Sequence, residues 1–345
     1  MKKKIISFML ILLAAILVLY FSLKDDYNTI INTILNINKI YLIVAFILLF
    51  LYYFLRSLCI YIISKNFKSD YKMKNAIRMV LETNFFHAIT PFATGGQPYE
   101  VYSLNKSGIK VADAISISVG NFITYQVALV SLGLIAIISN MLFKIIEASL
   151  LKGLIILGFI INFLVIVFLL WISISKKTDK NILYVLIDIL GKLKLIKNPQ
   201  QKKEKLKVYL TDFNKGSELL FKNKQKMLLL IIYHLVSLLL LYLIPYALFM
   251  GVGINVKIVD VVVIMSYVML IGSFVPIPGG TGGLEYGFVI FFTKYIVSSK
   301  VNAMMLVWRF ITYYFGLILG SIVLNIKKES KEWELEYLQI LIHHI

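Results

Sequence analysis

Residues that form most metal centres and catalytic sites are scarce in this sequence. The chain has a single cysteine, Cys59, within an apolar stretch, and four histidines without metal-ligand spacing. One cysteine cannot form an internal disulfide framework or a cysteine metal cluster. The sequence also lacks a Walker A segment, a dinucleotide-binding fingerprint, a zinc pattern and a recognisable nucleophile–base arrangement. We therefore expect no cofactor, no metal ion and no catalytic residues.

Acidic residues are also few, 18 against 36 lysines and arginines, which leaves a formal charge of +18. The excess is concentrated between Lys176 and Lys226, where 14 lysines accompany five acidic residues. A nucleic-acid site would need a folded basic face with stacking aromatics, and this segment offers little of either. Cytoplasmic loops of membrane proteins are rich in lysine, and each basic residue attracts anionic lipid headgroups by ~1 kcal/mol. We expect residues 176–226 to form a cytoplasmic loop beside anionic lipid headgroups, with no nucleic-acid partner.

Long hydrophobic runs occupy most of the remaining chain. Hydrophobic residues make up 59% of the 345 positions, above the roughly 45–50% of soluble domains. Runs near the ~20 residues of a membrane span lie at about 5–23, 40–63, 111–138, 150–174, 227–250 and 301–325. Two others, about 76–93 and 258–297, are interrupted by proline and glycine clusters. The sequence predicts an all-α polytopic membrane protein with one transmembrane domain, residues 1–345.

The lysines indicate how these runs cross the membrane. The run at 5–23 is too long for a signal-peptide core, so we expect a retained first span. If every run crossed, the 176–226 loop would lie outside, against the positive-inside tendency. If 76–93 instead enters from the cytoplasm and turns back, that loop and both termini are cytoplasmic, and 258–297 enters from outside. This arrangement predicts about six transmembrane helices and two re-entrant hairpins in the cell membrane.

An internal repeat supports the same arrangement. Thr94-Gly95-Gly96 recurs as Thr281-Gly282-Gly283, and Phe122–Tyr125 recurs as Phe310–Tyr313, each as Phe-Ile-Thr-Tyr. The threonine and the phenylalanine are 28 residues apart in one copy and 29 in the other. Repeat one would span about 40–140 and repeat two about 227–325, in opposite orientations, as in many transporters.

The hairpin turns have the chemistry of a polar site. Non-helical backbone at membrane depth persists only where protein or a water-filled cavity satisfies its polar groups. Glycine amides and a helix N-terminus can hold an anion such as a phosphate. Glu100 follows the first turn and Glu285 the second, each in a position to face a cation, an amine or an arginine. Alternatively, the glycines only permit tight turns and the glutamates bond nearby amides.

Other charged residues in the apolar runs are further candidates for substrate binding. Arg78 and Glu82 are four residues apart on one helix face and can pair, either within a site or as a structural salt bridge. Arg309, where the first copy has Asn121, would either lock a hairpin glutamate or bind a phosphate bidentately. Arg56 lies near the end of its predicted span, where it could reach the surface by snorkelling, so we leave it out of the predicted site.

The segments NFFHAITPFATGGQPYE and PIPGGTGGLE, with Arg309-Phe310 ahead of Tyr313, carry a resemblance to a known family. The chain resembles the membrane domain of lysylphosphatidylglycerol synthases of the multiple peptide resistance factor type. The resemblance implies a flippase that moves aminoacylated phosphatidylglycerol to the outer leaflet and so contributes to resistance to cationic antimicrobial peptides. It points to the two glycine turns, Glu100, Glu285 and Arg309. Asn121 is a departure, because relatives are expected to carry an arginine near it.

Full-length relatives of this type add a cytoplasmic domain that transfers lysine from lysyl-tRNA to the lipid. This sequence ends about 20 residues after its last predicted span, so we expect a stand-alone form without the synthase domain. The sequence leaves open whether a separate synthase is its partner. Two alternatives stay open: a phosphatidylglycerol lysyltransferase, as the family name suggests, and a secondary transporter of a soluble solute. The sequence leaves open whether the chain forms a homo-oligomer.

Overall fold

The computed structural model describes residues 27–146, 151–174, 200 and 213–326. Within these ranges the chain forms helices and no strand. The bounds of the elements are α2 Tyr27–Leu35, α3 Lys39–Ser64, α4 Met73–Ile89, η1 Pro91–Ala93, α5 Gly96–Lys106, α6 Val111–Phe143, α7 Lys152–Ile174, α10 Lys224–Gly251, α11 Ile258–Gly272, η2 Pro278–Gly280, α12 Gly283–Phe292, α13 Ser298–Arg309, η3 Phe310–Tyr314 and α14 Phe315–Asn325.

Five helical segments are long and apolar enough to cross a membrane. They are α3, α6, α7, α10 and the continuous α13–η3–α14 segment. Large apolar side chains are exposed along their outer faces, for example Ile47 on α3 and Phe168 on α7, as expected for surfaces that contact lipid. The protein is therefore a multi-pass membrane protein. Five of the six predicted spans are confirmed, and the sixth, at 5–23, lies outside the described residues.

The two interrupted runs form helical hairpins, as the sequence predicts. Helix α4 packs against α5 across η1, and α11 packs against α12 across η2. The longest of these four helices has 17 residues, about 25 Å at 1.5 Å per residue, which is short of the ~30 Å hydrocarbon core. The first hairpin extends beyond the predicted 76–93, because its returning helix continues to Lys106.

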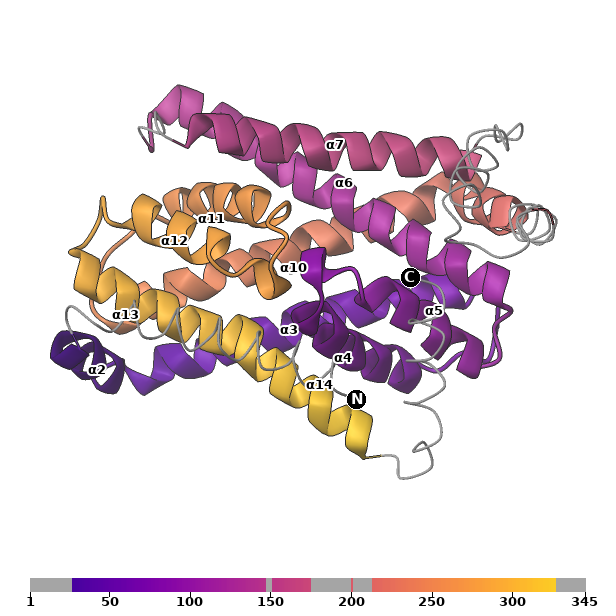
Figure 1. Cartoon of the computed structure of the whole chain (residues 1–345), viewed down its shortest axis with the longest axis horizontal. Coiled ribbons are helices and arrows are strands. Elements are labelled where there is room, and N and C mark those ends of the chain that lie inside the picture. The colour runs from indigo at the N-terminus through magenta and orange to yellow at the C-terminus, as the bar shows by residue number, and fades with distance from the viewer. Residues whose placement is uncertain (1–26, 147–150, 175–199, 201–212, 327–345) are drawn as a thin grey trace.

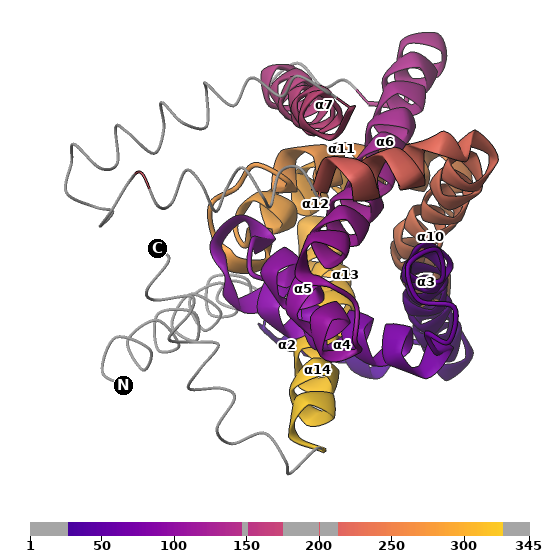
Figure 2. The ribbon, with the colours of Figure 1, turned by 90° about the vertical axis from the view of Figure 1, so that its right-hand side faces the viewer.

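The hairpins enter the molecule from opposite ends and meet in its middle. Figure 1 shows α11 and α12 on one side and α4 and α5 on the other, and η1 contacts η2. Along the long axis (Figure 2), the hairpins lie between α7 and α14, and α3 packs beside α10 at one edge. Each hairpin thus has a long helix before it, α3 or α10, and one after it, α6 or α13–α14.

The two hairpin tips share a local backbone geometry. In Pro91-Phe92-Ala93-Thr94 the φ angles of the second and third residues are 52° and 54°. In Pro278-Gly279-Gly280-Thr281 they are 68° and 63°. In each tip the threonine hydroxyl donates to the carbonyl of the proline, at 2.9 and 2.8 Å. The second copy uses glycine, which tolerates positive φ, whereas the first places Phe92 and Ala93 in the left-handed region at a cost of about 1–2 kcal/mol each.

Aromatic packing holds the second hairpin against the last transmembrane segment. The ring of Phe288 on α12 stacks on Trp308 of α13 at a centroid distance of 4.9 Å. Phe292 packs on Phe249 of α10 at 4.7 Å. All four side chains are buried, so the helix that carries Arg309 is packed against the hairpin that carries Glu285.

Candidate functional site

A cavity of about 560 Å³ lies where the two hairpin tips meet. Its walls come from both tips and from α3, α4, α5, α6, α7, α10, α11, α12, α13, η3 and α14. Apart from tyrosines and a tryptophan, the polar side chains that line it are Arg56, Asn84, His87, Thr94, Gln97, Glu100, Asn121, Gln126, Asn162, His234, Ser273, Arg309 and Thr312. So many polar groups at the centre of an otherwise apolar helix bundle make this cavity the candidate functional site.

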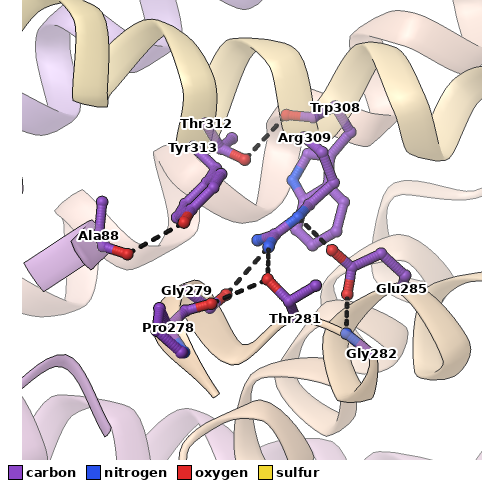
Figure 3. Close-up of polar contacts among 10 residues, drawn as sticks. All are labelled: Ala88, Pro278, Gly279, Thr281, Gly282, Glu285, Trp308, Arg309, Thr312 and Tyr313. Atoms are coloured by element: carbon purple, nitrogen blue, oxygen red, sulfur yellow. Dashed lines mark hydrogen bonds and ion pairs between the residues drawn. The ribbon is translucent and has the colours of Figure 1, made fainter. Parts of the chain in front are cut away.

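Arg309 and Glu285 form an ion pair beside this cavity (Figure 3). The Arg309 Nε lies 2.7 Å from Glu285 Oε1, and both side chains are less than a tenth exposed. Arg309 Nη2 also donates to the Gly279 carbonyl at 3.0 Å and to the Thr281 hydroxyl at 3.4 Å. One side chain of the last transmembrane segment is thereby tied to three positions of the second hairpin. Of the two roles that the sequence leaves open for Arg309, the structure shows the lock on the hairpin glutamate.

The positions of Glu285 and Arg309 in their helices bring the two side chains together. Glu285 is the third residue of α12, and its second carboxylate oxygen accepts a hydrogen bond from the Gly282 N–H at 2.7 Å. A carboxylate in the first turn stabilises the positive end of the helix dipole. Arg309 directly precedes the π-helical residues Phe310–Tyr314, and its guanidinium lies 4.6 Å from the Tyr313 ring centroid. Short π-helical segments occur frequently at functional sites.

The corresponding residues of the first copy have different hydrogen-bond partners. Asn121, which corresponds to Arg309, lies 3.1 Å from His234 Nε2 through its side-chain oxygen. Glu100 accepts a hydrogen bond from Ser118 at 2.7 Å and is 4% exposed. No ion pair equivalent to Arg309–Glu285 joins Glu100 to a basic residue among the described residues. The two copies therefore share the backbone geometry of their tips but not the arrangement of their charged side chains.

Comparison with known families agrees with this architecture. The sequence model described as the lysylphosphatidylglycerol synthase TM region matches residues 5–320. The chain belongs to this family. No curated protein matches the chain. Membership in the lysylphosphatidylglycerol synthase TM family confirms the resemblance seen in the sequence and indicates a function related to membrane lipids.

The glycine turns of this family member already use part of their hydrogen-bonding capacity internally. The Gly95 N–H donates to the Thr90 hydroxyl at 2.9 Å, as the Gly282 N–H does to Glu285. Gly96 packs so closely on His87 that a Cβ would lie 2.0 Å from its ring, and Gly283 lies against Val275. Contact with a substrate phosphate stays a prediction for Thr94, Gly95, Gly96, Thr281, Gly282 and Gly283.

The predicted pair Arg78–Glu82 forms, with 2.6 Å between Arg78 Nε and Glu82 Oε1. Tyr99 donates to the other Glu82 oxygen at 2.6 Å, and Arg78 Nη2 donates to the Val323 carbonyl at 3.3 Å. These bonds join α4 to α5 and α14. Neither Arg78 nor Glu82 lines the central cavity, so the geometry favours the structural salt bridge, and their contact with substrate stays a prediction.

Sequence reasoning missed several polar cavity residues, and Arg56 is the charged one among them. The sequence favours a snorkelling side chain at this position, but Arg56 lines the cavity and bonds from α3 to the first hairpin. Its Nη1 donates to the Tyr52 hydroxyl and to the Asn84 side-chain oxygen, both at 3.3 Å. The signal available in the sequence was Asn84, which belongs to the first family-like segment and faces α3.

Proposed function

We propose that this chain is a phospholipid flippase that moves an (aminoacyl-)phosphatidylglycerol-type lipid between the leaflets of the cell membrane. The observation that carries the proposal is the polar cavity at the meeting point of the hairpin tips, with the buried Arg309–Glu285 pair beside it. A charged headgroup pays a large desolvation penalty in hydrocarbon. A cavity with amides, hydroxyls and both signs of charge replaces part of its hydration.

The contacts of the tips indicate what must change for a headgroup to pass. Arg309 ties the second tip to the last transmembrane segment. Tyr313, four residues later, donates to the Ala88 carbonyl of the first hairpin at 3.0 Å. A phosphate competes with Glu285 for Arg309, and an amine competes with Arg309 for Glu285 or with Ser118 for Glu100. Binding of a zwitterionic headgroup would thus loosen both tips while the acyl tails stay in the surrounding lipid.

The biological setting follows from the same proposal. Export of an aminoacyl lipid makes the outer leaflet less negative, which weakens binding of cationic antimicrobial peptides. Both termini would lie in the cytoplasm, where the 176–226 loop would contact anionic lipid headgroups and a separate synthase would supply the substrate. With no ATP-binding element in the sequence, the driving force would be an ion gradient, the membrane potential or the lipid gradient itself.

The test is reconstitution of the purified chain into liposomes that contain fluorescent lysyl-phosphatidylglycerol. Outer-leaflet exposure is read with a membrane-impermeant quencher. We expect the wild-type chain to accelerate exposure over empty liposomes, and Glu285→Gln or Arg309→Ala to slow it at least tenfold. Asp70→Asn, which neutralises an exposed carboxylate, is the matched control and should keep the wild-type rate.

Two results would replace this proposal. If the purified chain forms lysyl-phosphatidylglycerol from lysyl-tRNA and phosphatidylglycerol, it is the lysyltransferase. If it moves a water-soluble solute into sealed vesicles and no lipid, it is a secondary transporter of that solute.

A further inference from the structure

Arg56 differs from the other cavity arginine in its lack of an acidic partner. Arg309 is paired with Glu285 at 2.7 Å. Among the described residues, no carboxylate forms an ion pair with Arg56. Its hydrogen bonds go to two neutral oxygens, those of Tyr52 and Asn84, and both are long at 3.3 Å.

The Arg56 guanidinium lines the cavity and uses few of its hydrogen-bond donors. A guanidinium has five N–H donors in a planar fork, and the hydrogen bonds to described residues all come from Nη1. The rings of Tyr52 and Tyr125 lie 5.6 and 6.0 Å from its central carbon. These rings hold the cation by cation–π attraction without neutralising it. Arg56 therefore lines the cavity with unused donors and without an ion-pair partner among the described residues.

A cation in such surroundings needs an anion. Removal of a guanidinium from water without a partner is costly. Glu100, a carboxylate in the same cavity, attracts Arg56 electrostatically, but it is hydrogen-bonded to Ser118 and forms no ion pair with Arg56. The donor fork of arginine matches the oxygens of a phosphate, which it binds with two parallel hydrogen bonds. Arg309 is less available, because Glu285, Gly279 and Thr281 already accept from it.

We infer that Arg56 is the phosphate-binding residue of the central cavity and takes the phosphate ester of a lipid headgroup. This inference rests on the proposed lipid function and adds to it the group that holds the anion. Asn84 and the two tyrosines position the guanidinium, and the unoccupied edge of its fork receives the phosphate oxygens. The Arg309–Glu285 pair then serves chiefly to close the second tip.

The experiment measures binding by the full chain in detergent, by calorimetry with dihexanoyl-phosphatidylglycerol. Dihexanoylglycerol is the uncharged comparison. Arg56→Gln should weaken binding of the phospholipid about tenfold or more, since hydrogen bonds to charged groups contribute about 1.5–3 kcal/mol and each 1.4 kcal/mol is tenfold. Arg56→Lys should bind the phospholipid with an affinity between those of the wild type and Arg56→Gln, because lysine keeps the positive charge but lacks the planar donor fork. Lys65→Gln removes an exposed charge from the C-terminal end of the same helix and should bind like wild type.

Equal binding of phospholipid by wild type and Arg56→Gln, or equal binding of the phospholipid and the uncharged lipid, would overturn the inference. Thermal unfolding of each variant shows whether it is folded, and partial recovery in Arg56→Lys separates phosphate binding from a purely structural role. Competition with inorganic phosphate and with glycerophosphoglycerol identifies the source of the anion. A lipid site predicts weak competition by both, and displacement by inorganic phosphate at equal concentration would contradict a lipid headgroup as the ligand.

The outcomes for the two proposals are separable. Arg56-dependent binding without lipid movement in liposomes would refute the flippase and leave the phosphate site standing. Wild-type lipid movement and wild-type binding by Arg56→Gln would refute the phosphate site and leave the flippase standing.

Discussion

At the scale of single residues, the Arg309–Glu285 pair dominates the energetics of the site. Both side chains are buried, and each holds backbone atoms of the second tip as well as its partner. Loss of one partner leaves the other as an uncompensated buried charge, which typically costs about 3–5 kcal/mol. Loss of both partners leaves no uncompensated buried charge. The pair is therefore expected to behave as a unit.

This expectation can be tested by a double-mutant cycle. Arg309→Gln and Glu285→Gln alone should each lower the midpoint of thermal unfolding in detergent substantially. The double variant should be more stable than the sum of the two effects predicts, with a coupling of about 0.5–3 kcal/mol. Strictly additive effects would show that the two side chains do not interact in the folded protein.

The residue scale also shows where prediction from sequence stops. Glu100 lies six residues after Thr94, but Glu285 lies four residues after Thr281. Two residues correspond to about 200° around a helix, so the glutamates face different directions and have different partners. Arg56 escapes prediction for a related reason. An apolar run shows neither which face of its helix points inward nor at which height along that helix a hairpin tip will contact it.

At the scale of elements, the last transmembrane segment connects the two hairpins. Arg309 directly precedes its π-helical turn and Tyr313 lies within that turn, and they bond to the second and the first hairpin respectively. The extra residue in a π-helical turn shifts the helix face that follows it. One segment can therefore present a basic residue to one tip and a phenol to the other.

The hydrogen bond from Tyr313 to Ala88 is expected to hold the first hairpin in its closed position. Tyr313→Phe removes the hydroxyl that bonds Ala88, a loss of about 1 kcal/mol, and should raise the population of the opened first tip about fivefold. Labelling of a cysteine introduced at Thr94 should accelerate by a similar factor. Tyr314→Phe is the matched control, since no hydrogen bond of the Tyr314 hydroxyl is found among the described residues, and it should leave the rate unchanged. Equal rates in both variants would mean that Tyr313 does not restrain the tip.

At the scale of the whole molecule, the arrangement of hairpins and spans was predictable and the assembly of the site was not. The apolar runs and the lysine distribution predicted five spans that the structure contains and both hairpins. The repeated Thr-Gly-Gly turn marked both tips. The contact between the tips, however, is a contact between the two copies, as is the packing of α3 of the first copy against α10 of the second. Packing of this kind has no local signature in the sequence.

The central claim is that two hairpin tips from opposite membrane faces meet inside the bilayer at one polar cavity. Cysteine accessibility tests it most directly, with Thr94→Cys and Thr281→Cys placed separately in the chain. Native Cys59 is buried, so the unaltered chain is the background. Ser69→Cys and Asn255→Cys, at exposed turns before α4 and α11, are the reference positions. With a membrane-impermeant thiol reagent, we predict that the references react rapidly from opposite faces and both tip cysteines react slowly from either. Rapid labelling of Thr94→Cys and Thr281→Cys from the same face would contradict the account.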